Sequence, residues 1–197
     1  MMKKLLPLLA AALLAACANI SKVEGEQLVN QRMTVKVTEA WNKVSLPGNV
    51  QPYEVWTQEG LALDELRLWA GVRSGQALIT LPAGSAQPGK KPPRVPTYMA
   101  GMAPDQLVNL FETMYAIDDS LVNVTRIEPA IFAGEKGVRF EFTVVRKRNE
   151  LLMQGVGWVS VRRDELFAAT FVAPKLTFYP RLLPKAEQIV RTAQIHG

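Results

Sequence analysis

Hydrophobic and polar side chains alternate with a period of two over much of the second half of the chain. The clearest run extends from Val138 to Val145, where one face is apolar throughout, as in a strand with a buried face. Two further apolar runs cover 152–161 and 166–173, and turn sequences at 147–150 and 162–165 separate the three runs. Three strands joined by tight turns predict a long antiparallel meander.

The rest of the chain contains shorter apolar runs and two helical patterns. Apolar residues at i, i+3, i+4 and i+7 from Leu107 to Met114 follow Pro104 and predict a helix over 104–117. A second apolar stripe predicts a closing helix over 182–193. Four short strands are predicted before the first helix, over 34–43, 53–57, 66–70 and 76–81.

The order of these elements predicts one α+β domain. Its mostly antiparallel sheet ends in the three-stranded meander, and the helices pack on the sheet. The run 152–161 has apolar residues on both faces, which indicates a sheet that is covered on both sides. Gly155 and Gly157 inside this run are interpreted as a bulge or as close packing against a neighbour such as Trp158.

The N-terminal segment has the parts of a secretory signal peptide. Two lysines precede an apolar run over 5–14, and the sequence Leu-Ala-Ala-Cys at 14–17 resembles the lipobox of bacterial lipoproteins. This predicts a signal peptide over 1–16, cleavage after Ala16, and acylation of Cys17 with palmitate-type chains. The apolar run is too short for a transmembrane helix, which needs about 20 residues.

The predicted anchor fixes the location and the boundaries of the domain. Cys17 is the only cysteine, so acylation leaves no free thiol, whereas an ordinary secretory signal would leave one. Two or more acyl chains hold a protein firmly at a membrane. In lipoproteins that this leader resembles, a residue other than Asp directly after the acylated cysteine directs the protein to the outer membrane. Ala18 therefore predicts an outer-membrane anchor, with the domain facing the periplasm. Residues 17–26 are interpreted as a polar, lipidated tether, and 27–197 as a single domain.

The chain carries a small positive excess. Its 23 basic and 18 acidic residues give a net charge of +5. Loss of Lys3 and Lys4 with the signal peptide leaves 21 against 18, or +3. This excess weakly favours anionic partners such as lipid headgroups or cell-wall polymers. Nucleic acid is not expected as a partner of an exported envelope protein.

Residues for metal or nucleophilic chemistry are scarce. His196 is the only histidine and is expected in a frayed tail, and acylation uses the one cysteine. We therefore expect no metal site, no cofactor and no catalytic triad. Carboxylate pairs at 64–65, 118–119 and 164–165 are expected to point apart into solvent, unlike the facing pair of a glycosidase. The protein is predicted not to be an enzyme; a carboxylate pair with raised pKa values in a cleft would reverse this.

One segment is rich in proline and positively charged. Residues 82–96 contain five prolines and two glycines, together with Lys90, Lys91 and Arg94. Proline excludes a helix there. The segment is interpreted either as a solvated loop or as a contact arm for an anionic surface or a groove of a protein.

Several short segments resemble a family of Gram-negative bacterial lipoproteins that have a PsbP-like α/β/α arrangement and no established activity. These segments are Leu46-Pro47-Gly48, Val55-Trp56-Thr57, Gly60 to Leu66, Gly75-Gln76-Ala77-Leu78, Ala103-Pro104-Asp105, Gly137 to Phe142, and Ala173-Pro174. The resemblance implies a binding or scaffolding role.

These observations lead to two hypotheses of different classes. The first is a lipid-anchored, non-enzymatic accessory or scaffolding domain that faces the periplasm and has a protein partner in the envelope. The alternative is a periplasmic carrier or binder of a lipid or other apolar ligand, suggested by the aromatic residues of the predicted strands. A carrier requires a cavity of about 300 Å³ or more.

Overall fold

The computed structural model describes residues 19–45, 50–81 and 93–196. The predicted signal peptide over 1–16, its cleavage site at Ala16 and the acylated Cys17 lie outside these ranges. Lys90 and Lys91 of the proline-rich segment lie outside them as well. The predictions for these residues therefore remain predictions.

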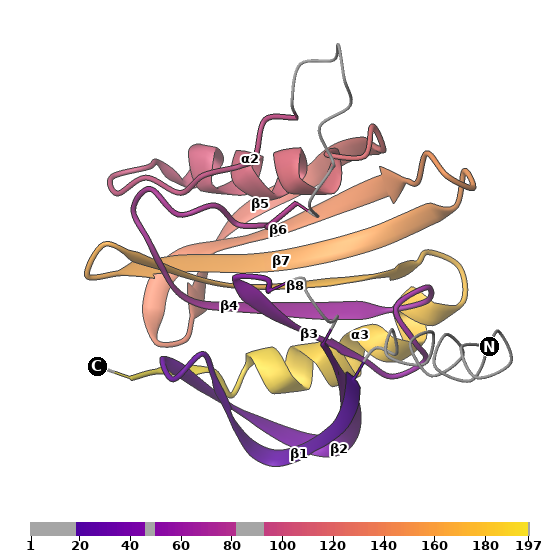
Figure 1. Ribbon diagram of the computed structural model, residues 1–197, viewed down its shortest axis with the longest axis horizontal. Coiled ribbons are helices and arrows are strands. Elements are labelled where there is room, and N and C mark those ends of the chain that lie inside the picture. Colours follow the sequence, from indigo (N-terminus) through magenta and orange to yellow (C-terminus); the bar gives the residue numbers. More distant parts are fainter. Residues whose placement is uncertain (1–18, 46–49, 82–92, 197) are drawn as a thin grey trace, which may run out of the picture.

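One antiparallel sheet forms the centre of the molecule, and a helix covers each face (Figure 1). Along the sheet the strand order is β1-β2-β3-β4-β8-β7-β6-β5, and the short β9 pairs with β2. The strands are β1 Asn19–Val29, β2 Met33–Ser45, β3 Tyr53–Thr57, β4 Glu65–Arg73, β5 Leu121–Phe132, β6 Glu135–Val145, β7 Leu152–Arg162, β8 Glu165–Pro174 and β9 Gln194–Ile195. The helices are α2 Pro104–Tyr115 and α3 Phe178–Val190. The predicted α+β class with a mostly antiparallel sheet agrees with this architecture.

Two apolar cores lie on opposite faces of the sheet. Alternation along β7 directs Val156 and Trp158 into the core beneath α3, and Met153 and Val159 into the core beneath α2. The prediction that the sheet is covered on both sides is therefore confirmed. The β1–β2 hairpin curves around α3, so that α3 is enclosed between this hairpin and β8 (Figure 1).

The two glycines of β7 make room for aromatic rings of β6. Phe142 lies directly opposite Gly155, and Phe140 opposite Gly157. A Cβ atom on Gly155 would lie 2.4 Å from Cζ of Phe142, and one on Gly157 would lie 2.2 Å from Cζ of Phe140. The β6–β7 register continues through these positions, so the close-packing interpretation holds, with phenylalanine rather than Trp158 as the neighbour.

The predicted tether is wrong from Asn19 onward. Residues 19–29 form β1, which pairs with β2 from Asn19 opposite Ser45 to Val29 opposite Met33. β1 escaped prediction because most of its exposed side chains are polar, apart from Ile20 and Leu28, and only Val23 and Val29 are buried. Backbone pairing therefore holds this edge strand more than apolar burial does.

Two other predicted elements differ from the structure. Residues 76–81 form a single bridge, Ala77 opposite Thr97, rather than a strand. The backbone of Leu78 is instead engaged by a bond from its N–H to Pro96 O and by the indole of Trp69, which donates to its carbonyl. The closing helix begins at Phe178, earlier than predicted, because Phe178 and Tyr179 also pack on the core.

Candidate functional site

Two charged residues, Glu65 and Arg67, lie in the middle of the sheet. They are two positions apart in β4, so both side chains point to the same face. Their side chains are only 14% and 17% exposed. β4 is a central strand between β3 and β8, which is why charges on this face are enclosed rather than solvated.

The guanidinium of Arg67 is held between two tyrosine rings. Its carbon lies 5.0 Å from the ring centre of Tyr53 and 5.1 Å from that of Tyr115, close enough for cation–π attraction. Nε and Nη2 both donate to Oε2 of Glu65, at 2.9 and 2.6 Å. Nη1 has a weak partner, the sulfur of Met114 at 4.0 Å. The planar group is therefore fixed in orientation, with Nη1 the least satisfied of its donors.

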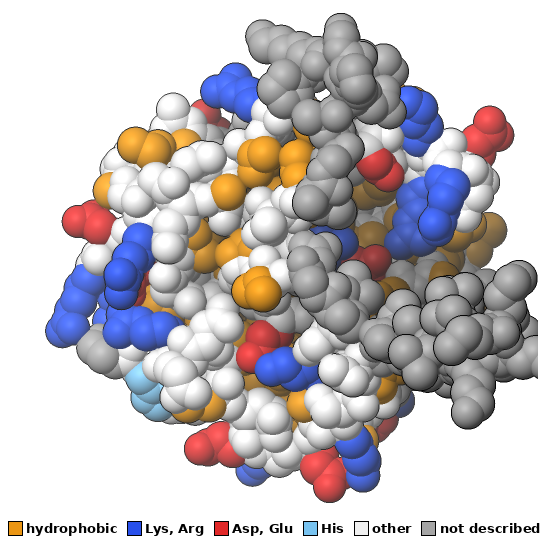
Figure 2. Space-filling view, in the orientation of Figure 1, with side chains coloured by type: hydrophobic (Ala, Val, Ile, Leu, Met, Phe, Trp, Pro, Cys, Tyr) orange, Lys and Arg blue, Asp and Glu red, His pale blue; other side chains and the backbone are white. Residues whose placement is uncertain are grey.

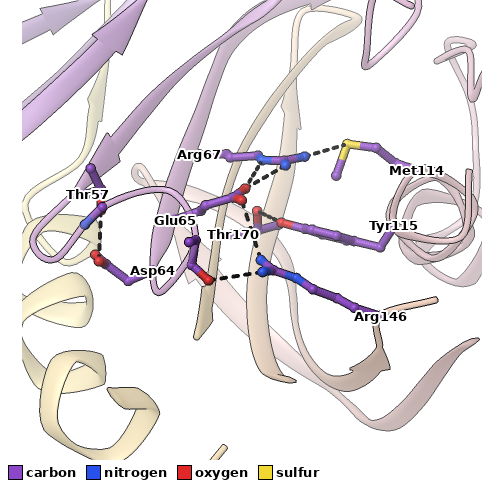
Figure 3. A network of polar contacts seen from close by, with 10 residues as sticks. Thr57, Asp64, Glu65, Arg67, Met114, Tyr115, Arg146 and Thr170 are labelled. Atoms are coloured by element: carbon purple, nitrogen blue, oxygen red, sulfur yellow. Dashed lines mark hydrogen bonds and ion pairs between the residues drawn. The ribbon is translucent and has the colours of Figure 1, made fainter. Parts of the chain in front are cut away.

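A second arginine approaches Glu65 from the turn between β6 and β7. Nη2 of Arg146 lies 3.7 Å from Oε1 of Glu65, and Nη1 donates to the carbonyl of Ala62 at 3.0 Å. Glu65 therefore lies between the two guanidinium groups of Arg67 and Arg146 (Figure 3). We call Glu65, Arg67 and Arg146 the charged cluster.

Burial and charge fix the protonation of this region. Burial alone would lower the pKa of Arg67, but the adjacent Glu65 carboxylate, Tyr115 and Tyr53 together raise it above the ordinary arginine value. Burial also raises the pKa of Tyr115 to about 12, although the Arg67 charge opposes the rise. Its hydroxyl is within 2.7 Å of Oγ1 of Thr170. Arg67 is thus a permanent cation and Tyr115 a neutral phenol, which suits recognition better than proton transfer.

Two cavities meet at the charged cluster. One, of about 320 Å³, is lined by Leu61, Glu65, Arg67 and Arg146 together with the end of α2. The other, of about 440 Å³, is lined by Leu61, Glu65 and Arg67 together with the facing parts of β2 and β3. The first cavity also contains Arg148, so three guanidinium groups border it, and such groups bind carboxylate or phosphate oxygens.

Asp64, the residue before Glu65, binds groups of its own loop instead of the arginines. Asp64 is fully buried, and its oxygens accept hydrogen bonds from Oγ1 of Thr57 at 2.8 Å and from the backbone N–H groups of Gln58 and Glu59, each at 2.7 Å. It therefore closes the loop between β3 and β4. The two carboxylates do point apart, as predicted (Figure 3), but the expectation that they are solvated is wrong.

The other predicted site residues lie away from the charged cluster. Arg94 borders a groove of about 760 Å³ between residues 94–99, α2 and β5. His196 is held rather than frayed, because β9 pairs with β2 and Nε2 of His196 lies 2.8 Å from Oγ1 of Thr34. Within residues 19–45, 50–81 and 93–196, no group of histidine, cysteine and carboxylate side chains could hold a metal ion.

The two remaining carboxylate pairs belong to turns. Asp119 forms an ion pair with Lys147, and Asp118 accepts a bond from the N–H of Ser120. Glu165, the first residue of β8, forms an ion pair with Arg32. No helix in the part of the chain that the structure describes is long and apolar enough to cross a bilayer.

Sequence reasoning missed the charged cluster because its parts are far apart in the chain. Arg146 is 81 positions from Glu65, and nothing in the sequence links them. A local signal did exist: Glu65 and Arg67 alternate with Leu66 and Leu68, which are fully buried. When both faces of a sheet are covered, the face of the strand opposite Leu66 and Leu68 is also enclosed. Charged residues on that face therefore indicate a buried polar site.

Comparison with known proteins supports the fold alone. No protein-family model matches the chain, and no curated sequence is significantly similar to it. The solution structure of cyanobacterial PsbP (CyanoP) from Synechocystis sp. PCC 6803 matches with a TM-score of 0.55 at 11% identity, over 92% of this chain and 95% of that one. LpqN, involved in cell envelope biogenesis of Mycobacterium tuberculosis, matches with a TM-score of 0.33 at 10% identity, over 93% and 86% of the two chains. The first likeness agrees with the predicted PsbP-like arrangement of sheet and helices.

Proposed function

We propose that this protein is a lipid-anchored, non-enzymatic accessory or scaffolding domain of the outer membrane that faces the periplasm. We further propose that it recognises an anionic group of a protein partner in the cavity beside the charged cluster. The observation that carries this proposal is the orientation of Arg67, a buried cation clamped between two tyrosines at the border of two cavities.

The chemistry of the 320 Å³ cavity supports an anionic ligand. Its charged lining residues are Glu65, Arg67, Asp118, Arg146 and Arg148, three cations against two carboxylates, so the balance is one positive charge. Planar guanidinium groups at fixed positions bind carboxylates with two parallel hydrogen bonds. A carboxylate side chain or a chain terminus of a partner would therefore find donors already oriented.

The lipid anchor rests on the sequence of the leader. The lipobox-like residues 14–17, the short apolar run before them and the single cysteine all favour acylation of Cys17. An anchor of two or three acyl chains keeps a domain at one membrane, which is the arrangement an accessory protein needs. The proline-rich segment with Lys90, Lys91 and Arg94 is proposed as a second contact for the same partner.

The cavities of about 320, 440 and 760 Å³ reach the volume that a carrier requires, but the packing of the aromatic side chains gives the carrier hypothesis less support. The aromatic side chains that suggested it contact one another: the ring centre of Trp69 lies 5.4 Å from that of Phe111, and Phe111 lies 5.4 Å from Phe140. These three side chains are fully or almost fully buried. They fill the core beneath α2 rather than surround a space for an apolar ligand.

Site-directed photo-crosslinking in intact cells tests the partner proposal. A photoreactive residue in place of Leu61, which borders both cavities, should give a discrete adduct with one envelope protein. Arg146→Gln in the same chain should weaken that adduct severalfold, because it removes a cation beside the cavity. The control is the same probe in place of Ile127, which lines the separate groove beside Arg94. Adducts at Ile127 and none at Leu61 would move the binding site to that groove.

A further inference from the structure

The first strand begins two residues after the predicted lipid attachment site. We infer that the end of the domain where β1 begins rests on the lipid surface of the membrane, with Ile20 and Val50 in contact with it. The inference depends on the proposed anchor at Cys17 and adds to it an orientation of the domain.

Asn19 belongs to the folded domain, which leaves little chain for a spacer. It lies opposite Ser45, and Ile20 lies opposite Val44, in a ladder that continues along β1. Covalent geometry allows two residues a reach of at most about 7 Å. The acylated residue 17 and Asn19 are separated by that distance at most, so the surface around Asn19 lies next to the headgroups.

The exposed side chains at this end suit a lipid surface. Ile20 is 65% exposed and Val50 is 87% exposed. Both lie near the last residues of β2: Ile20 is opposite Val44, and Val50 lines one cavity together with Val44 and Ser45. Apolar side chains that sit beside an acyl anchor gain by entering the boundary between headgroups and acyl chains.

The charges nearby are already paired. Lys22 forms an ion pair with Glu24, and Lys43 with Glu54, each at 2.7 Å. Basic and acidic side chains are also intermixed over the face seen in Figure 2. The contact is therefore apolar in origin and should form on vesicles without net charge as well as on anionic ones.

The opposite edge of the sheet provides a matched position. β1 and β5 are the two edge strands, and Ile131 in β5 is 67% exposed, almost the same as Ile20. With the start of β1 at the membrane, Ile131 lies in the strand at the other edge of the sheet. The cavity lined by Ser45, Val50 and Arg67 then opens beside the bilayer, so a partner reaches the charged cluster along the membrane surface.

Fluorescence quenching by labelled lipid tests this orientation. The full precursor is expressed in a bacterium, its acylation is verified by mass spectrometry, and the protein is reconstituted into phosphatidylcholine vesicles. Cys17 is the only cysteine and its sulfur carries lipid, so Ile20→Cys, Val50→Cys or Ile131→Cys each supplies one thiol for an environment-sensitive fluorophore. Quenching by a spin-labelled lipid should be about twofold or more stronger at 20 and 50 than at 131, because such quenching requires contact with the interface.

Two controls separate the orientation from the anchor. Protein that is not acylated or does not float with the vesicles would overturn the proposed anchor and this inference together. Protein that floats but is quenched equally at Val50→Cys and Ile131→Cys would overturn the orientation and leave the anchor intact. The chain that begins at Ala18, which lacks both the leader and Cys17, should neither float nor be quenched when Val50→Cys carries the fluorophore, since the apolar contact is too small to bind alone.

Discussion

The buried pair of Glu65 and Arg67 allows a quantitative test by a double-mutant cycle. The variants are Glu65→Gln, Arg67→Met and the two substitutions together. Oε2 of Glu65 accepts both Arg67 bonds, and the two side chains keep only 14% and 17% of their surface exposed. Each single variant therefore leaves an enclosed charge without its main partner, whereas the double variant removes both charges.

The magnitudes follow from the cost of an unpaired buried charge. Breaking a fully buried ion pair costs about 3–5 kcal/mol. Because these side chains keep some exposure, we expect about 2–4 kcal/mol for Glu65→Gln, which leaves the guanidinium groups of Arg67 and Arg146 without the carboxylate between them. Arg67→Met should cost less, about 1–3 kcal/mol, because Arg146 still lies 3.7 Å from Glu65. The double variant should cost about 1–2 kcal/mol, because it removes both charges of the pair but leaves a glutamine in the sheet and takes away the carboxylate that lies beside Arg146.

Urea unfolding at neutral pH and fixed salt measures these values for the chain that begins at Ala18. The free energies of unfolding of the four proteins give a coupling energy of about 3 kcal/mol if the pair acts as a unit. The denaturant slope should stay unchanged across the set. Additive costs, with a coupling below about 0.5 kcal/mol, would refute the reasoning.

Three further predictions concern other positions. The pKa of Tyr115 is about 12 in the folded protein and 10.0 in the unfolded chain, so the unfolded chain loses the phenol proton at lower pH. The free energy of unfolding should therefore be highest below pH 10 and fall by about 2 kcal/mol between pH 10 and pH 12. Tyr115→Phe should flatten this decline in urea midpoints, and an unchanged decline would assign it elsewhere. Gly155→Ala should lower stability by about 1–3 kcal/mol through its clash with Phe142, measured by thermal unfolding; a wild-type melting temperature would contradict the close contact. Ala103→Ser should raise stability by about 1 kcal/mol, because Ala103 is extended at the start of α2 and its N–H already donates to Gln106. No gain in the urea midpoint would show that a hydroxyl there cannot cap the helix.

Elements with strong burial could be predicted from the sequence. In β6 the side chains of Val138, Phe140, Phe142 and Val144 are all buried, so the alternation in sequence is the alternation of burial. The stripe of α2 works in the same way, since its apolar residues are the buried ones. In such elements the residues that are apolar in the sequence are the residues that the fold buries, so the period of the sequence predicts the element.

Elements held by the backbone could not be predicted in this way. The exposed outer side chains of β1 carry no apolar period, and the strand exists because β2 offers it a ladder of partners. Residues 76–81 carry a plausible strand pattern but lack a partner strand within the described ranges, since Pro96 and the Trp69 indole take the backbone groups of Leu78. Pairing partners are a property of the whole fold.

The site was hidden for a different reason. Asp64 and Glu65 look alike in sequence, as adjacent acids after a turn. The fold directs Asp64 to the backbone N–H groups of its own loop and Glu65 to guanidinium groups of β4 and of the distant β6–β7 turn. One carboxylate closes a loop and the other orients two cations, a difference that depends on which long-range partner each one meets.

The energetics of the charged cluster also bear on why it is there. A buried ion pair is no more stabilising than well-packed apolar residues of the same volume, and apart from Thr170 the strand beside β4 is mostly apolar on this face. Stability alone therefore gives no reason for Glu65, Arg67 and Arg146 to occupy it. If the double variant Glu65→Gln/Arg67→Met is as stable as the natural protein but loses the cross-link from the cavity, the cluster serves recognition. If stability and cross-link both persist, the arginines have no part in binding, and the groove beside Arg94 becomes the better site.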